Sequence, residues 1–320
     1  MSLDIKNTSK MKNEEIQFIK RCIETPMTFQ YSEGTFAKLL LSYLSEDRQK
    51  ISEIKASKIG YLLHKPSVKA VVAKCGNGLL KKELLQEEWT EKTKILSLSL
   101  SQWGIQDTKK KNCAYYQVSR PQKSLVLQVN FGGDHDTFFY SCFSKKQRVY
   151  FSNEMHAGHF KRNSLGWIRI DLDLETGEAL IEEVQTDWMK TVFSLRNELK
   201  LDNSDHALIM KRPNACKSYV NYMLQRYKAW DEMLLSSAIR FLKQEIGINT
   251  IWYHTFESGR FYKMMPDYSL PPRSLYTTLP KKMGFEITNQ IPKILKECKE
   301  LKRMNNAAKG INFFRLNFKK

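Results

Sequence analysis

The chain lacks most of the features that identify common enzyme classes from sequence. Its six cysteines are scattered without a Cys-x-x-Cys pair, so neither a zinc ribbon nor a disulfide framework is indicated. There is no Gly-x-Gly-x-x-Gly segment, no Walker loop and no nucleophile elbow, which argues against Rossmann, P-loop and covalent-hydrolase proteins. Internal repeats and low-complexity segments are also absent. The sequence therefore predicts a folded protein of another class.

Long apolar runs are missing as well. No uninterrupted run reaches the roughly 18 residues that a membrane-spanning helix needs. The N-terminus has no apolar segment behind basic residues, so we expect no signal peptide. Because the scattered cysteines suit a reducing compartment, we expect a cytoplasmic protein without a membrane span.

Acidic residues are few compared with basic ones. The 52 Lys and Arg against 34 Asp and Glu leave a net charge of +18, a balance that favours anionic partners. Lysines recur along the first 90 residues, at positions Lys55, Lys58, Lys65, Lys69, Lys74, Lys81 and Lys82. We expect a polyanion such as nucleic acid to bind this surface, although a solvated helix face explains the same lysines.

The apolar pattern divides the 320 residues into two parts. From Asn13 to about Trp89 apolar residues recur at helical spacing, which predicts a helical N-terminal unit, residues 1–90. Strands are predicted beyond it, at 95–101, 124–131, 138–143, 148–151, 250–254 and 311–318. Helices are predicted at 227–245, where Gly247 ends the helix, and at 292–305. We expect an α/β (α+β) protein whose second domain, residues 91–320, is a mixed, mostly antiparallel sheet with packed helices.

An acid-rich β-hairpin is predicted between residues 166 and 188. Apolar and polar residues alternate along its first half, as in a half-buried strand, and Thr176-Gly177 supplies a turn. A two-residue turn there would place Asp171 opposite Glu182 and would put Glu183 on the apolar face. Burial raises the pKa of such a carboxyl group, and opposed like charges are destabilising unless a cation separates them. A functional role would explain why the chain keeps a buried carboxyl group and two opposed acids. The alternative is that these acids face water on a sheet edge and have no such role.

A second polar cluster surrounds the segment Gly132–Asp136. Because this segment lies between two predicted strands, we expect a hairpin turn. The alternative is a metal site, in which His156 and His159 would lie near Asp134, His135 or Asp136.

The hairpin, the long helix and buried strand after it, and Ser274–Phe285 resemble the second half of a GNAT acyltransferase, over about residues 166–286. In that family a helix with a Tyr leads into a Gly-Phe before the next strand, as Tyr276 and Gly284-Phe285 do here. The resemblance implies an N-acyltransferase that uses acetyl-CoA or another acyl-CoA. Glu183, or else Glu182, then matches the general base, and Tyr276 matches the acid that protonates the departing thiolate.

The chain departs from the GNAT pattern at the pyrophosphate loop. The family's glycine-containing loop has no match between Trp188 and Trp230, where about 40 residues are inserted. Lys211 and Arg212 are the only adjacent basic pair in that interval, so they are the candidate cofactor-binding residues.

The same hairpin also resembles a degenerate PD-(D/E)XK nuclease motif. Asp171 or Asp173 precedes Glu183-Val-Gln185 on the next strand, and in that family two acids hold Mg²⁺ while a Lys orients the water. Gln185 stands in the place of that Lys. This resemblance implies a magnesium-dependent nuclease with Asp171, Asp173 and Glu183 as metal ligands.

A third resemblance concerns the heptad Glu182-Glu-Val-Gln-Thr-Asp-Trp188. Together with Trp230 and Trp252 it resembles a region of large polyvalent proteins of phages and mobile elements. That resemblance implies a bacterial intracellular or mobile-element setting and fixes no activity. A non-catalytic nucleic-acid- or protein-binding module is therefore the third hypothesis.

Overall fold

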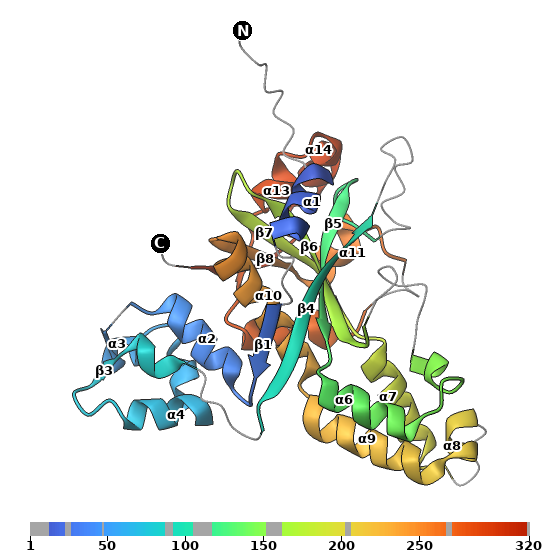
Figure 1. The fold of residues 1–320 in the computed structure, drawn as a ribbon. Helices are drawn as coiled ribbons and strands as arrows, with labels where there is room; N and C mark the ends of the chain where they lie inside the picture. The colour runs from blue at the N-terminus through green and yellow to red at the C-terminus, as the bar shows by residue number, and fades with distance from the viewer. Residues whose placement is uncertain are drawn as a thin grey trace.

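Within the residues that the structure describes, an eight-stranded mixed sheet runs through the middle of the molecule (Figure 1). The structure is a computed structural model, and it describes residues 13–22, 27–46, 48–86, 92–104, 117–151, 162–201, 206–266 and 271–318. The strand order is β1-β4-β5-β6-β7-β8-β10-β9. The strands are β1 (Met27–Tyr31), β4 (Lys94–Gly104), β5 (Lys123–Asn130), β6 (Ser164–Asp173), β7 (Glu178–Gln185), β8 (Thr250–His254), β9 (Glu286–Thr288) and β10 (Phe313–Asn317).

All neighbouring strands of this sheet are antiparallel except β7 and β8, which are parallel. A separate two-stranded sheet joins β2 (Gln49–Lys50) to β3 (Leu79–Leu80). The predicted α/β architecture with a mixed, mostly antiparallel sheet is confirmed.

The central strands are buried on both faces. All ten residues of β6 are buried, including the charged ones. One face packs against α10 (Trp230–Arg240), and the other is covered near β7 by α13 (Lys293–Lys296). The apolar cluster on that second face includes Leu180, Trp252, Ile294 and Leu295. The alternation along β6 predicted a strand with one face in water, but here the polar face must satisfy its charges inside the protein.

The N-terminal part contributes a helical layer and one edge of the sheet. Its helices are α1 (Asn13–Cys22), α2 (Thr35–Leu44), α3 (Ile51–Ala56), η1 (Gly60–His64), α4 (Pro66–Ala73) and η2 (Lys82–Leu85). They lie where the sequence predicts a helical unit, yet β1 pairs with β4 and the apolar core is continuous with the sheet. The domain boundary near residue 90 stays a prediction.

A helical lobe lies at the lower right of Figure 1, across from the N-terminal helices in that view. It consists of α6 (Gly133–Cys142), η3 (Arg148–Phe151), α7 (Trp188–Glu198), α8 (Ala207–Lys211) and α9 (Pro213–Tyr227). The predicted turn at Gly132–Asp136 and the predicted strands at 138–143 and 148–151 are therefore wrong. Aromatic residues in this stretch favour a strand by type, but the buried His135, Phe139 and Cys142 follow helical spacing. His156 and His159 lie outside the described residues.

The C-terminal part follows the predictions more closely. α10 continues into a π-helical segment, η4 (Phe241–Ile246), which ends at Gly247 with φ of 82°. β8 and β10 lie in predicted strands, and between them are α11 (Phe256–Tyr262), η6 (Arg273–Tyr276) and α12 (Thr278–Lys282). The single helix predicted over 292–305 is instead α13, η7 (Lys299–Leu301) and α14 (Lys302–Ala307). The chain folds back there, because Asn305 Nδ2 donates to the Leu295 carbonyl, 2.9 Å away.

The imidazole of His135 is fully buried in the helical lobe. Trp188 Nε1 donates to the Tyr219 hydroxyl (2.7 Å), which lies 2.8 Å from His135 Nε2, and Nδ1 lies 3.0 Å from Asp136 Oδ1. A neutral imidazole completes this chain, since Tyr219 then donates to Nε2 and Nδ1 donates to Asp136. Burial lowers the pKa of His135, although Asp136 acts in the opposite direction.

We expect the protein to lose stability as the pH falls below about 6.5, because the unfolded chain then binds a proton that the folded His135 does not. His135→Gln should flatten the dependence of the unfolding free energy on pH between about 5 and 7. Part of the slope should remain, since burial also lowers the pKa of His254. Urea unfolding at stepped pH measures the slope, and the exposed His64→Gln is the control. An unchanged slope in His135→Gln would mean that folded His135 accepts the proton.

Candidate functional site

The parallel strands β7 and β8 separate part of the way along the sheet. They pair only from Glu178 to Ile181 on β7, opposite Thr250 to Tyr253 on β8. Immediately afterwards the register between β6 and β7 shifts, so that Glu182 is an extra, bulged residue. A β-bulge bends its strand and redirects the side chains beside it. The bulge therefore opens the sheet between β7 and β8.

A cleft of about 600 Å³ lies beyond this point. Its walls combine apolar, polar and charged side chains. The lining residues are Gln117, Glu183, Val184, Gln185, Thr186, Lys190, Phe193, Lys228, Trp230, Asp231, Met265, Pro271, Pro272, Ser274 and Leu275. Apolar walls with a few converging polar groups are typical of small-molecule sites.

Backbone strain also gathers at this cleft. Gln117 and Met264 have φ of 51° and 50°, which is rare for residues other than glycine. Gln117 lines the cleft, and Met264 precedes the lining residue Met265. Strained residues cluster at ligand sites, because the surrounding structure must hold them in place.

Glu183 brings a carboxylate to the wall of the cleft. Its side chain is 14% exposed, and Oε2 lies 2.7 Å from Arg169 Nη2. The same Arg169 nitrogen donates to the Gln117 carbonyl (3.0 Å), so the guanidinium links both sides of the cleft wall. This ion pair holds Glu183 in one orientation with part of its surface facing the cleft.

Glu182 points instead into a closed polar network. Its two carboxylate oxygens accept hydrogen bonds from the backbone N–H and the hydroxyl of Ser119, at 3.1 and 3.0 Å. His254 Nε2 and Lys263 Nζ lie 3.5 and 3.7 Å from Oε2. Burial alone would raise the pKa of Glu182, but the contact with His254 and the charge of Lys263 lower it to about 2. Glu182 is thus an ionised, fully buried group that does not line the cleft.

Tyr276 lies behind the cleft, next to the bulge. Its phenol is buried, and the hydroxyl donates to the Glu182 carbonyl at 3.4 Å. Lys263 Nζ donates to the same carbonyl oxygen. Burial raises the pKa of Tyr276 well above its usual value, so the phenol keeps its proton. Ser274 and Leu275, which precede it, line the cleft directly.

The hairpin turn differs from the predicted one, and the difference moves the acidic residues. Asp173 pairs with Glu178, which leaves a four-residue loop instead of a two-residue turn. Asp173 Oδ1 accepts from the backbone N–H groups of Glu175 and Thr176, both at 3.0 Å, and so stabilises the longer loop. The predicted register is therefore wrong, and Asp171 opposes Leu180.

Asp171 forms a buried ion pair on the opposite side of the sheet from α10. Arg120 Nε lies 2.6 Å from Oδ2 and Nη2 lies 2.7 Å from Oδ1, while Gln122 Nε2 donates to the same carboxylate. Burial raises the pKa of Asp171, and Arg120 opposes that rise. Asp171, Asp173 and Glu183 thus have separate partners. No group of three or more His, Cys, Asp or Glu within the described ranges is placed to hold a metal ion.

The predicted cofactor pair lies elsewhere. Lys211 ends α8 and Arg212 precedes α9, where Arg212 Nη1 donates to the Cys142 carbonyl (3.4 Å). Neither residue lines the cleft. The basic residues that do are Lys190, whose Nζ is 3.4 Å from Asp187, and Lys228. The sequence held one signal for them: both lie close to the ends of the inserted segment between Trp188 and Trp230.

Comparison with known proteins finds no match for this chain, neither a family model nor a curated protein nor a solved structure. No helix in the described part of the chain is both long and apolar enough to cross a membrane. Fold and site together define a mixed α/β protein with a strained, partly charged cleft where two parallel strands of its sheet separate.

Proposed function

We propose that the cleft binds an acyl-CoA and an amine and transfers the acyl group, as in a GNAT-like N-acyltransferase. The observation that carries this proposal is the position of Glu183, a carboxylate on the wall of the cleft where β7 and β8 separate. Tyr276, a buried and protonated phenol, lies behind the same bulge. Glu183 on the cleft wall, and Tyr276 next to the lining residue Leu275, support the proposal.

The strand order supports the same proposal. The hairpin β6–β7, the helices ending in α10, the parallel strand β8 and then Tyr276 and Gly284-Phe285 before β9 follow the order of the GNAT resemblance. The likeness concerns the arrangement of elements, and activity depends on the site itself.

The lining of the cleft suits an acyl-CoA in part. Phe193, Trp230 and Leu275 offer apolar surface, and Lys190 and Lys228 offer positive charge for phosphates. The backbone N–H groups at the N-terminus of α10 are less available to a phosphate, because Asp231 already accepts the Glu232 backbone N–H at 3.0 Å. We therefore assign phosphate binding to the two lysines.

The chemistry requires a base and an acid. A bound acyl-CoA would supply a thioester whose carbonyl carbon is open to attack. Glu183 takes a proton from the ammonium group to release the neutral amine, or from the amine nitrogen as it attacks; the nitrogen bonds to the thioester carbonyl carbon and the C–S bond breaks. The GNAT resemblance gives the role of acid to Tyr276, but its hydroxyl is buried and bonded to the Glu182 carbonyl. The proton that Glu183 takes from the amine therefore returns to the departing thiolate, which completes the proton balance. Glu183 and Asp231 also attract a cationic amine into the cleft.

Binding of acetyl-CoA tests the site before any assay of turnover. Lys190→Glu/Lys228→Glu should weaken acetyl-CoA binding about tenfold or more, since two attractive charges become repulsive near the phosphates. Lys211→Glu/Arg212→Glu is the matched control and should bind like the wild type. Isothermal titration calorimetry measures both. No binding of acetyl-CoA at about 1 mM, or equal losses in both variants, would contradict the assignment.

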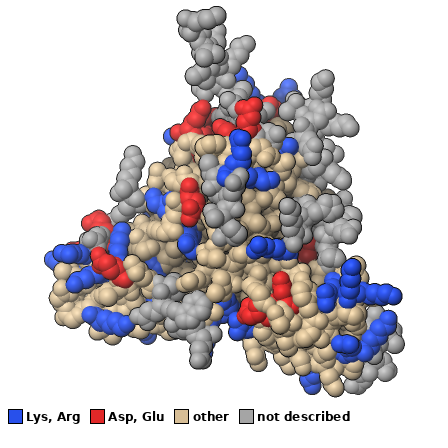
Figure 2. Space-filling model, viewed as in Figure 1, with Lys and Arg blue, Asp and Glu red and all other residues tan. Residues whose placement is uncertain are grey.

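A polyanion-binding surface is a second proposal, and the charge distribution of the helical lobe favours it. Lys and Arg side chains gather at its far end, over the lower right of Figure 2. We call this group the basic tip, and its exposed residues are Lys145, Lys146, Lys211, Arg212 and Lys217. The Arg212–Cys142 contact holds the end of α6 against the start of α9 there. Among the N-terminal lysines, Lys58 is already paired with Glu286 at 2.7 Å.

Short duplex DNA should bind with an affinity that falls about 10³-fold or more between 50 and 200 mM salt if roughly six phosphates are contacted. Lys145→Glu/Lys146→Glu/Lys217→Glu should weaken binding at low salt by about tenfold or more, because each reversal removes a phosphate contact and adds repulsion. Lys55→Glu/Lys69→Glu/Lys74→Glu is the matched set on the N-terminal helices. Fluorescence anisotropy measures both variants. A larger loss in the N-terminal set would move the site there, and a flat salt response would remove the electrostatic argument.

A further inference from the structure

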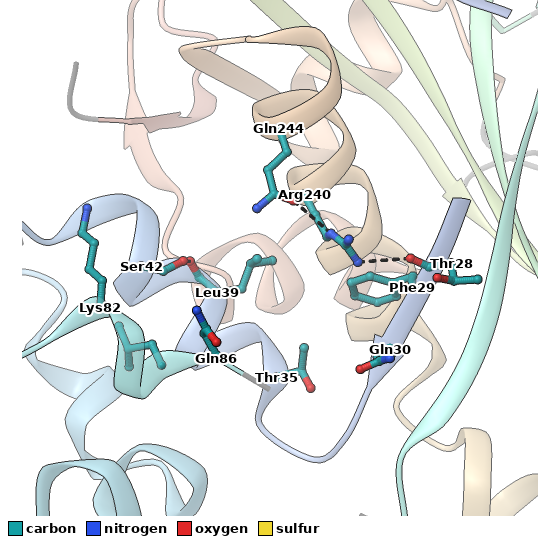
Figure 3. A pocket seen from close by; sticks show the side chains of 11 residues that line it. Thr28, Phe29, Gln30, Thr35, Leu39, Ser42, Lys82, Gln86, Arg240 and Gln244 are labelled. Carbon is teal, nitrogen blue, oxygen red and sulfur yellow. Dashed lines mark hydrogen bonds between the residues drawn. The ribbon is translucent and has the colours of Figure 1, made fainter. Parts of the chain in front are cut away.

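A second cavity, of about 490 Å³, lies away from the cleft, where β1, α2, η2 and the end of α10 meet (Figure 3). Arg240 and Gln244 form one wall, and Lys82 and Gln86 come from the opposite wall. The cavity shares no lining residue with the cleft between β7 and β8. Its volume is in the range of small-molecule sites.

Arg240 is held in place by hydrogen bonds, and no carboxylate of the described residues neutralises it. Nη1 donates to the Thr28 carbonyl (3.2 Å), Nε donates to Gln244 Oε1 (3.0 Å), and the guanidinium lies 5.9 Å from the centroid of the Phe29 ring. Within the described residues, no carboxylate forms an ion pair with Arg240 or Lys82. A fixed guanidinium with N–H groups to spare is prepared to bind an anion.

The helix changes its geometry at this cavity. Arg240 is the last residue of α10, and Gln244 lies inside the π-helical segment that follows. π-helical turns are rare and occur frequently at functional sites, because they cost regular hydrogen bonds. Here the turn carries the Arg240–Gln244 pair, whose hydrogen bond orients the guanidinium along the cavity wall.

The remaining lining indicates the chemistry of a ligand. Amides and hydroxyls dominate it, from Gln30, Gln86, Thr28, Thr35 and Ser42. A short apolar strip is formed by Phe29, Leu39 and Leu85, and among the described residues no acidic side chain lines the cavity. Two cations on opposite walls, with hydrogen-bonding groups between them, suit an anion that carries more than one negative charge.

We infer that this cavity binds a small organic phosphate, with Arg240 and Lys82 holding its negative charges. The site is separate from the proposed acyl-transfer cleft and does not depend on it. Arg240 also holds the edge strand β1 through its hydrogen bond to the Thr28 carbonyl, so its replacement changes more than ligand binding. Lys82 forms no side-chain hydrogen bond or ion pair within the described residues, so its replacement tests the role in binding with the smallest effect on the fold.

The test is calorimetric titration of the full chain with inorganic pyrophosphate, ADP and succinate. We expect the two phosphates to bind and Lys82→Met to weaken them about tenfold, with a loss at least as large in Arg240→Met. Lys81→Met, a neighbouring exposed lysine outside the cavity lining, should bind like the wild type. Urea unfolding shows whether Arg240→Met remains folded. If Arg240→Met is unfolded, the affinity of Lys82→Met for the two phosphates tests the inference alone.

Several results would overturn the inference. One is the absence of binding by both phosphates at about 10 mM, and another is wild-type affinity in Lys82→Met. Succinate binding as tightly as pyrophosphate would reject the phosphate class. Loss of ADP binding in Lys190→Glu/Lys228→Glu, with no loss in Lys82→Met, would place ADP in the cleft instead.

Discussion

Replacing Arg120 with methionine should lower the free energy of unfolding by about 3–5 kcal/mol, the usual cost of removing one partner from a buried ion pair. The side chains of Arg120 and Asp171 are 0% and 1% exposed, and they form a two-pronged contact at 2.6 and 2.7 Å. Without Arg120, the Asp171 carboxylate would remain buried, and Gln122 is the other side chain of the described residues that donates a hydrogen bond to it. Since a domain is stable by only about 5–15 kcal/mol, this single change would remove a large share of the total.

Two control variants separate the ion pair from general packing. Arg120→Met/Asp171→Leu should recover most of the loss, because neither side chain then carries a buried charge. Lys58→Met breaks a pair whose side chains are 79% and 52% exposed, so it should cost less than about 1 kcal/mol. Urea denaturation measures all three. A loss below about 1 kcal/mol for Arg120→Met would show that the pair contributes little.

Asp171→Asn distinguishes this ion pair from the magnesium hypothesis. If Asp171 were a metal ligand repelled by Glu182, neutralising it would stabilise the metal-free protein. If Asp171 neutralises Arg120, the same change should destabilise the protein, with or without EDTA. The register supports the second outcome, since Asp171 opposes Leu180 and Glu182 is bonded to Ser119.

Much of the fold could be predicted because local sequence encodes it. The alternation along residues 168–172 marks a strand, Gly247 ends a helix, and 250–254 is a buried strand, all as the structure has them. The sequence does not predict α6, because its aromatic residues favour a strand by type. Burial of His135 and Phe139 on one face of the segment in the lobe stabilises a helix instead. The turn was missed because a side chain, Asp173, stabilises the longer loop.

The site could be predicted only in part. The family resemblance points to Glu183, which lines the cleft, and to Tyr276, which lies behind it, and their roles stay predictions. Lys228 and Gln117 reach it from distant segments, and their approach depends on how β7 and β8 separate. The partners of Asp171 and Glu182, which are Arg120 and Ser119, precede β5 and are about 50 to 60 residues away in sequence. Local periodicity carries no information on such pairings.

Glu183→Gln should lower the rate of acyl transfer by about 10²- to 10⁴-fold, the usual contribution of a positioned general base. The amide has nearly the same shape, and its oxygen still accepts from Arg169, so the fold and the affinity for acetyl-CoA should be retained. The assay follows acetylation of a panel of amines by mass spectrometry. This method detects the acetylated amine itself, whereas an assay of released CoA thiol would also respond to the chain's own cysteine thiols. Calorimetry with acetyl-CoA shows whether binding survives the substitution.

The control for this prediction is Glu175→Gln, an exposed carboxylate in the loop of the same hairpin, which should leave the rate unchanged. Glu183→Asp keeps the carboxylate but moves it away from the amine by the length of one methylene, so its rate should lie between those of Glu183→Gln and the wild type. If Glu183→Gln and Glu175→Gln acetylate the amines equally fast, Glu183 is not the base. If the wild type binds acetyl-CoA but acetylates none of the amines, the cleft is a binding site and the carboxylate only orients its ligand.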